Sequence, residues 1–226
     1  MTFGAAGVGA PLLAFLDWAW IARNFPVVVD RAVEHLYLTA VPMAIGILIA
    51  FPLALVAVRW PRMYGPLLGT SGVLFTIPSL ALFGAMVPIT GLSAWTAIIP
   101  LTIYTLLVLL RNMVEGLRAV DSDVLEAAEA MGYQRPRRIL TVELPLALPI
   151  MFAGARIATV TTIGLVTISV MVGQGGLGRL ILDGAQRSFP TPLLVGIAVT
   201  IVLAVSADLL LLGAQRLVTP WTRRTG

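Results

Sequence analysis

Few residues in this sequence have the types and spacing that catalysis or metal binding would need. The chain has no cysteine, which excludes disulfides and thiolate metal sites, and its one histidine is His35. It contains neither a His-Glu-x-x-His metal motif nor a Gly-x-Ser-x-Gly nucleophile motif, so we predict no catalytic residue and no metal site. His35 follows Glu34 at the edge of an apolar segment. We interpret it as an interfacial residue, with a pH-sensing role as the alternative.

Nucleotide binding is also poorly supported, although one motif matches letter for letter. Residues 173–178 read GQGGLG, but the dinucleotide pattern has that meaning only between a strand and a helix. Here it follows a long apolar segment, and we interpret its glycines as a turn at which the chain bends. They are Gly173, Gly175, Gly176 and Gly178. The phosphate-binding motif of ATPases requires lysine, and the chain has none, so we expect no cofactor in this chain.

Two charges stand inside apolar segments, where a charge is costly and is usually paired. Arg156 lies nine positions after the start of the segment 147–172, and Asp208 lies eight positions before Arg216. At 1.5 Å per residue, both lie roughly 12–13 Å from the same end of their helices. We predict that they form an ion pair within the membrane. Contact with a substrate and extension of the side chains towards water are the alternatives.

The remainder of the chain is strongly apolar, and this determines the class of fold. Hydrophobic residues make up 58% of the 226 residues and charged residues only 12%, about half the share that is usual in soluble domains. A helix needs roughly 20 apolar residues to span a bilayer and satisfies its own backbone hydrogen bonds there. We therefore predict an all-α polytopic membrane protein with five core transmembrane helices. The predicted spans are residues 36–58, 67–87, 94–110, 147–172 and 193–214.

The arginines predict how these spans are oriented. Basic residues stay preferentially on the cytoplasmic side, so the side with more of them is inside. Four lie on one side, namely Arg23, Arg31, Arg179 and Arg187. Ten lie on the other, namely Arg59, Arg62, Arg111, Arg118, Arg135, Arg137, Arg138, Arg216, Arg223 and Arg224. We therefore predict an N-terminus outside and a C-terminus inside, and do not interpret the net charge of +4 as a sign of nucleic-acid binding.

The predicted domains follow from this topology. Residues 1–35 form an N-terminal segment at the outer interface, where Trp18 and Trp20 suit the boundary between lipid and water. Residues 36–216 form the transmembrane domain, and residues 217–226 form a cytoplasmic tail. A sixth span within the N-terminal segment is an alternative that would place both termini inside.

The connection from residue 111 to residue 146 is unusually long and is predicted to fold into two short helices. Asp121 or Ser122 can cap the first helix, and Gly132 can end it. Pro136 suits the first turn of the second helix, and Pro145 marks where that helix gives way to the fourth span. We expect one surface of the first helix to have little side-chain bulk and to fit a groove on another protein. That surface comprises Ala127, Ala128 and Ala130, edged by Glu126 and Glu129.

This segment resembles the cytoplasmic signature of the permease subunits of binding-protein-dependent ABC importers. Val142 stands where isoleucine is usual, and the positions that match are Glu126, Ala127, Ala128, Gly132, Leu144 and Pro145. The resemblance implies a type I ABC importer permease in the plasma membrane, whose loop forms a coupling helix that docks in a cleft of an ATPase subunit. It also implies ATP and Mg²⁺ in that ATPase dimer, a second permease subunit, identical or related, and an extracytoplasmic substrate-binding protein.

Residues 75–92, 106–112 and 173–185 are similar to the osmoprotectant branch of that family, which imports glycine betaine, choline, carnitine or proline betaine. This resemblance places the glycine turn near an outer gate. Phe75, Trp95 and Tyr104 could offer aromatic faces to a quaternary ammonium group. The hydroxyl residues of the third and fourth spans either line a polar pathway or bond neighbouring helices together. A permease for an amino acid or a thiol-histidine derivative, and an ATP-independent channel or scaffold, are the alternatives.

Overall fold

The computed structural model describes residues 16–221, and the regular structure of this part is entirely helical. The all-α prediction is confirmed. Residues 1–15 and 222–226, which belong to the predicted N-terminal segment and cytoplasmic tail, lie outside the described residues. In chain order the elements are α1 (Trp18–Arg59), α2 (Pro61–Thr76), α3 (Ser79–Thr90), α4 (Trp95–Arg118), α5 (Ser122–Ala130), α6 (Arg135–Arg138), the π-helical η2 (Ile139–Glu143), α7 (Leu144–Ile168), the 3₁₀-helical η3 (Ser169–Val172), α8 (Gly178–Gln186) and α9 (Pro190–Val218).

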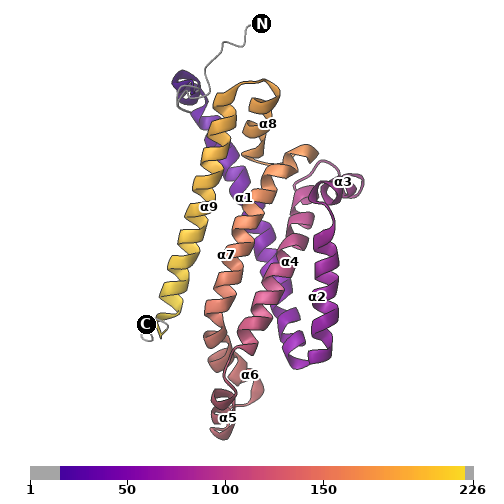
Figure 1. Ribbon diagram of the computed structural model, residues 1–226, viewed down its shortest axis with the longest axis vertical. Coiled ribbons are helices and arrows are strands. Elements are labelled where there is room, and N and C mark those ends of the chain that lie inside the picture. The colour runs from indigo at the N-terminus through magenta and orange to yellow at the C-terminus, as the bar shows by residue number, and fades with distance from the viewer. Residues whose placement is uncertain (1–15, 222–226) are drawn as a thin grey trace, which may run out of the picture.

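The long helices lie side by side along one axis (Figure 1). α8 lies at one end of the bundle and α5 and α6 lie at the other, and we call these the α8 end and the α5 end. Four segments are long and apolar enough to cross a membrane, namely α1, α4, Arg135–Val172 and α9. α2 and α3 together make a fifth as a bent pair. The number of predicted spans agrees with the structure when this pair counts as one.

The prediction of a single helix over residues 67–87 is wrong. α2 and α3 meet at a break where their axes differ by 90°. Pro78 explains the break, because a proline disfavours helical geometry in the residue before it, and Ile77 is extended, with φ −63° and ψ 127°. Tyr104 Oη donates a hydrogen bond of 2.5 Å to the carbonyl of Ile77, so the backbone oxygen at the break has a partner.

α1 is longer than the sequence predicts. It begins at Trp18, passes residue 36 without a break and ends at Arg59. Its 42 residues span roughly 63 Å at 1.5 Å per residue. Asp17 caps the helix by accepting a hydrogen bond of 2.9 Å from the N–H of Trp20. Residues 18–35 therefore belong to the same helix as the first predicted span, and residues 16–35 contain no separate helix for the alternative sixth span.

The core lies where α1, α4 and α7 pack together. α1 contributes small residues at helical spacing, and Ala50, Ala54 and Ala57 are fully buried. They meet larger side chains of α4, including Leu109 and Val114. Small side chains let membrane helices approach closely. This packing fixes the ends of α4 and α7, from which the long loop between them emerges.

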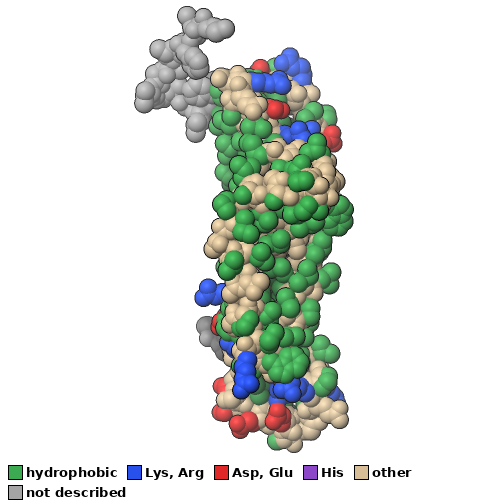
Figure 2. All heavy atoms as spheres, turned by 90° about the vertical axis from the view of Figure 1, so that its right-hand side faces the viewer, with side chains coloured by type: hydrophobic (Ala, Val, Ile, Leu, Met, Phe, Trp, Pro, Cys, Tyr) green, Lys and Arg blue, Asp and Glu red, His purple; other side chains and the backbone are tan. Residues whose placement is uncertain are grey.

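The distribution of side chains agrees with helices that cross a membrane. Figure 2 shows one face of the molecule, on which hydrophobic side chains cover the middle and charged side chains gather at both ends. Large apolar residues are exposed along the helices, for example Leu48 at 73% on α1 and Leu210 at 74% on α9. Exposed apolar surface on this scale is expected where lipid or another membrane subunit covers a helix.

Candidate functional site

The clearest candidate site is the loop between α4 and α7, which lies at the α5 end (Figure 1). Its first helix, α5, is capped by the carboxylate of Asp121, which accepts a hydrogen bond of 2.9 Å from a backbone N–H. α5 ends in a Schellman motif, in which the N–H of Gly132 donates to the carbonyl of Glu129 and that of Tyr133 donates to Ala128. Gly132 has φ +81°, which a side chain would strain. The predicted helix and glycine turn are confirmed.

The outer surface of α5 is small and open to solvent. Glu126, Ala127 and Ala130 are exposed, and Met131, directly after the helix, is 69% exposed. Ala128 differs from the prediction, because it is 1% exposed. A helix turns by roughly 100° per residue, so Ala128 points away from Ala127 and towards the α6 and η2 side, against which α5 packs. The open surface therefore includes two of the three expected alanines.

The second half of the loop continues into a membrane helix without a break. Pro136 lies in the first turn of α6, as predicted. The chain then passes through η2 into α7, which begins with Leu144 and Pro145. The expected transition to the fourth span at Pro145 is present within one residue, because α7 begins at Leu144, although the helical geometry is not interrupted there. Proline has no N–H for the regular bond to the carbonyl four residues earlier, and the wider π turn accommodates it.

The sequence analysis does not identify Arg138, which joins the two halves of the loop. Its Nε donates to Glu143 at 2.8 Å, and its guanidinium also pairs with Glu129 of α5. The side chains of Arg138 and Glu143 are only 12% and 7% exposed. Residues five apart lie on different faces of a regular α-helix, so it is the π turn that brings these two together. Spacing alone could not reveal this pair.

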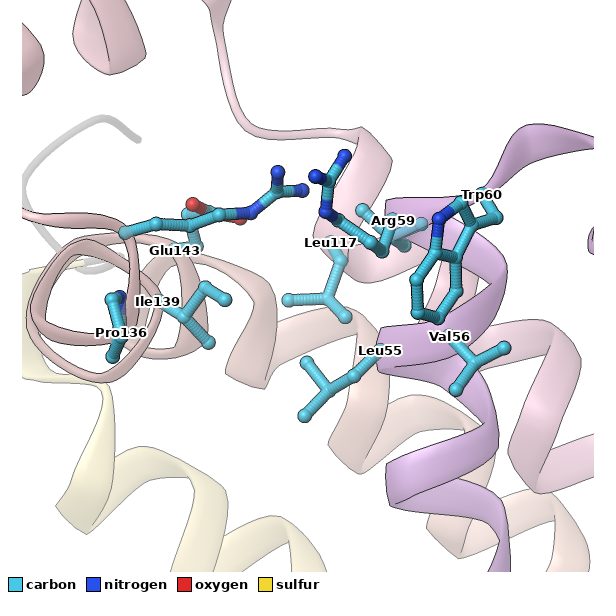
Figure 3. Close-up of a pocket in the computed structure, with 10 residues that line it drawn as sticks. Leu55, Val56, Arg59, Trp60, Leu117, Pro136, Ile139 and Glu143 are labelled. Atoms are coloured by element: carbon cyan, nitrogen blue, oxygen red, sulfur yellow. The ribbon is translucent and has the colours of Figure 1, made fainter.

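A cavity of about 340 Å³ separates the second half of the loop from the ends of α1 and α4 (Figure 3). Ile139 and Glu143 lie on one side of it, and Val56 and Trp60 lie on the other. The second half of the loop therefore joins the bundle through η2, which is continuous with α7. The cavity is lined by Leu55, Val56, Val58, Arg59, Trp60, Leu117, Arg135, Pro136, Ile139 and Glu143.

At the α8 end, the glycine turn packs tightly on α1. Gly173, Gly175 and Gly176 have positive φ, and Gly178 begins α8. A Cβ at Gly176 would lie 2.7 Å from the Cα of His35, so only glycine fits there without movement.

His35 is fully buried, and its Nε2 donates a hydrogen bond of 3.0 Å to the carbonyl of Ile163 on α7. The prediction that His35 is an interfacial residue is therefore wrong, because the glycine turn and α7 cover it. Within residues 16–221 no group of three or more His, Asp or Glu side chains could hold a metal ion.

Arg156 of α7 and Asp208 of α9 lie against each other. Arg156 Nε lies 2.7 Å from Asp208 Oδ1, and Nη2 lies 2.7 Å from Oδ2, which is a bidentate geometry. The two side chains are 28% and 31% exposed. They border a groove of about 440 Å³ that is also lined by Ala153, Ile157, Val160 and Thr161.

The structure does not bring all three aromatic candidates together. The rings of Phe75 and Tyr104 meet edge to face with centroids 5.6 Å apart, whereas Trp95 lies at the start of α4 and is 53% exposed. Tyr104 is 5% exposed, and its hydroxyl supports the α2–α3 break. Thr96 of α4 bonds to Thr90 and to the carbonyl of Gly91, outside its own helix, whereas several other hydroxyl residues of α4, α7 and η3 bond within their own helical segments. Their partners lie three or four residues earlier, as in Thr159 to Ala155, Thr162 to Ala158, Ser169 to Val166 and Thr102 to Ile98.

Comparison with known proteins finds similarity over most of the chain. The family model "Binding-protein-dependent transport system inner membrane component" matches residues 42–224. The choline transport system permease protein OpuBB of Bacillus subtilis is 33% identical over 190 residues, which cover 84% of this chain and 88% of that protein. The glycine betaine/carnitine/choline transport system permease protein OpuCB of Bacillus subtilis is 34% identical over 187 residues, with coverage of 83% and 86%. The osmoprotectant import permease protein OsmW of Salmonella typhimurium is 36% identical over 192 residues, with coverage of 83% and 89%.

Solved structures agree on the fold. A chain of the MetNI methionine ABC transporter, in an inward-facing conformation, matches with a TM-score of 0.79 and 24% identity, over 87% of this chain and 98% of that chain. A chain of an amino acid ABC transporter with histidines matches with a TM-score of 0.73 and 20% identity, over 89% and 98% of the two chains. At these identities the likeness shows the fold alone.

Proposed function

The chain belongs to the family of binding-protein-dependent transport system inner membrane components, and from this premise we propose that it is the transmembrane subunit of an importer for a small quaternary-ammonium solute. The solute class comes from relatives that are about one-third identical over most of their length and are named for choline, glycine betaine and carnitine. Proline betaine has the same chemistry and belongs to the same proposal. The membrane is the plasma membrane, with the N-terminus outside and the C-terminus inside.

The energy comes from a partner in this proposal, because the chain lacks the lysine that a phosphate-binding loop requires. An ATPase dimer carries ATP and Mg²⁺ and contacts the exposed surface of α5 around Glu126 and Ala127. A second permease subunit, identical or related, completes the pathway, and an extracytoplasmic binding protein delivers the solute. This role does not require catalytic residues in the chain itself.

The loop geometry suits the transmission of movement from α5 into the membrane. α5 is closed by a Schellman motif at Gly132, and Arg138 pairs with a carboxylate on α5 and with another on η2. η2 continues directly into α7. Because α5, η2 and α7 are connected in this way, a displacement of α5 by the ATPase would also move α7. This continuity from α5 to α7 is the observation that carries the coupling part of the proposal.

The α8 end would then form the outer side of the pathway. The turn containing Gly173, Gly175 and Gly176 joins α7 to α8, and it packs on α1 at His35. A movement of α7 would reach this turn, which is our reason for keeping it as the outer gate. Phe75 and Trp95 keep exposed ring surface that could contact a quaternary ammonium group.

Uptake by the assembled transporter tests this proposal. The chain would be reconstituted into liposomes with its ATPase and its binding protein, and labelled glycine betaine, choline, carnitine and methionine would be offered in turn. We expect ATP-dependent accumulation of at least one quaternary-ammonium solute and none of methionine. Accumulation of methionine alone would contradict the solute class. Equal flux with and without ATP would contradict the importer assignment and favour a channel.

A further inference from the structure

The ion pair between Arg156 and Asp208 lies at a depth where lipid could not solvate it. Arg156 is the middle residue of the 25-residue helix α7. Its partner Asp208 is on α9, which is 29 residues long and starts 18 positions earlier, at Pro190. Yet about 30% of each side chain is exposed in the isolated chain. Charged groups within membrane helices almost always face the interior of a bundle or a water-filled cavity.

The guanidinium of Arg156 also has donors left over. An arginine carries five N–H groups, and the pair with Asp208 uses one on Nε and one on Nη2. The other three find no acceptor among residues 16–221. Hydrocarbon offers no acceptor, so the exposed side of this pair requires water or polar groups from another chain.

The surroundings of the pair differ from the rest of the lipid-facing surface. The neighbouring exposed positions of α7 include the small residues Ala153 and Gly164 and the hydroxyl residue Thr161, together with the apolar Ile157 and Val160. Thr159 and Thr162, by contrast, are buried and bonded to their own helix. The opposite face of α9 is different again, since Leu210 is 74% exposed and purely apolar. The side of the α7–α9 seam that bears the pair therefore combines its charges and the Thr161 hydroxyl with apolar residues, whereas the far side of α9 is apolar and suits lipid.

We infer that the groove between α7 and α9 faces the water-filled pathway between this chain and the second permease subunit. The inference rests on the proposed function, because it takes the pathway to lie between two permeases. A dry contact with another subunit suits the groove less well, because a concave space of about 440 Å³ beside three unpaired donors is more readily filled by water than by a packed side chain. The solute would pass Arg156 and Asp208 in this groove.

Accessibility of introduced cysteines tests the inference, and the native chain has no cysteine to interfere. Val160→Cys and Thr161→Cys place a thiol in the groove with little change in volume. Leu210→Cys is the matched control, because two residues along α9 turn it by roughly 200° from Asp208. Each variant would be assembled with its partners and treated with a charged, membrane-impermeant thiol reagent. Such reagents need a thiolate, which forms in water and not in lipid.

We expect labelling at positions 160 and 161, slowed by saturating solute, and no labelling at position 210. Unlabelled groove positions would overturn the inference, as would equal labelling of all three. Disulfide formation between two copies at position 160, without labelling, would show a dry subunit contact and would also overturn it. ATP-driven uptake by the same variants separates this test from the proposed function. If the groove positions stay unlabelled while the transporter still accumulates glycine betaine, the result contradicts only the inference that the groove faces the pathway.

Discussion

Two arginines connect separate helices through carboxylates. Arg138 connects α5 to η2 through Glu129 and Glu143, and Arg156 connects α7 to α9 through Asp208. A guanidinium is planar and has five donors, so it can hold two oxygens at once in a fixed geometry, which a lysine cannot reproduce. Conservative substitutions at these positions therefore test the links without disturbing the apolar core.

Replacing Arg138 with Ala should lower the amount of solute imported per ATP hydrolysed. The change leaves Glu143 as a buried carboxylate without its partner, at a cost of about 3 kcal/mol or more, and it releases α5 from η2. Arg138→Lys should restore only part of the ratio. Uptake and phosphate release measured in the same proteoliposomes give this ratio directly.

Arg137→Ala is the control for that experiment, because Arg137 is the exposed neighbour and stacks on Tyr133 at 4.9 Å. It should leave the ratio close to that of the unmodified chain. If Arg138→Ala and Arg137→Ala gave the same ratio, the ion pairs of Arg138 would have no part in coupling.

Single Ala substitutions at Arg156 and Asp208 should each reduce the yield of folded complex. Each leaves one charge at mid-depth with only the water of the groove in place of its counter-ion, whereas the double Ala variant removes both charges and should recover part of the yield. Folded yield and uptake across this double-mutant cycle separate a structural pair from a substrate contact. Normal folding with poor transport in both single variants, and no improvement in the double variant, would show that the pair acts on the solute and not on the fold.

Among the elements, the loop between α4 and α7 shows what the sequence can and cannot predict. The α5 helix, its cap and its glycine terminator follow from local rules, and they are present. The π turn of η2 does not follow, because it depends on how Pro145 is accommodated at the start of α7. The pair of Arg138 with Glu143 exists only because of that turn, so the sequence could not reveal it.

Two other features differ from their prediction because of contacts between segments that are distant in the sequence. The helix predicted over residues 67–87 breaks at Pro78, and Tyr104 of α4 stabilises the break by donating to the carbonyl of Ile77. His35 has no local signal for burial, since the glycine turn that covers it is about 140 residues away in sequence. Such contacts between distant segments are not visible in a single sequence.

Replacing Gly132 with Val should impair coupled transport while the chain still inserts into the membrane. Gly132 has φ +81°, and a left-handed conformation costs a side-chain-bearing residue roughly 1–2 kcal/mol. Gly132→Asn is the matched control, because asparagine tolerates this conformation better than other residues. Uptake should be highest with the native Gly132, lower with Asn at this position and lowest with Val. Uptake by the Val variant equal to that of the unmodified chain would show that the Schellman motif is not needed for coupling.

For the whole molecule, the structure places the two ends of the bundle and the sequence predicts which side of the membrane each faces. Gln134 lies at the α5 end, and Gln186 ends α8 at the opposite end (Figure 1). Both are exposed, so a single cysteine at either position should react with an impermeant thiol reagent from one side only. We expect Gln134→Cys to react from the cytoplasmic side and Gln186→Cys from outside. The reverse result would place α5 on the side of the membrane opposite to the one where ATP is available.

The central claim is that an ATPase acting on α5 drives solute uptake through this chain. The most direct test is ATP-driven uptake of labelled glycine betaine by proteoliposomes that contain the assembled transporter, with either the native chain or Glu126→Lys. Glu126 is exposed on the α5 surface, so its reversal of charge should disturb docking and not folding. The account predicts uptake that requires ATP and the binding protein and that Glu126→Lys abolishes or strongly reduces. Uptake that continues without ATP, or that is unchanged in Glu126→Lys, would contradict it.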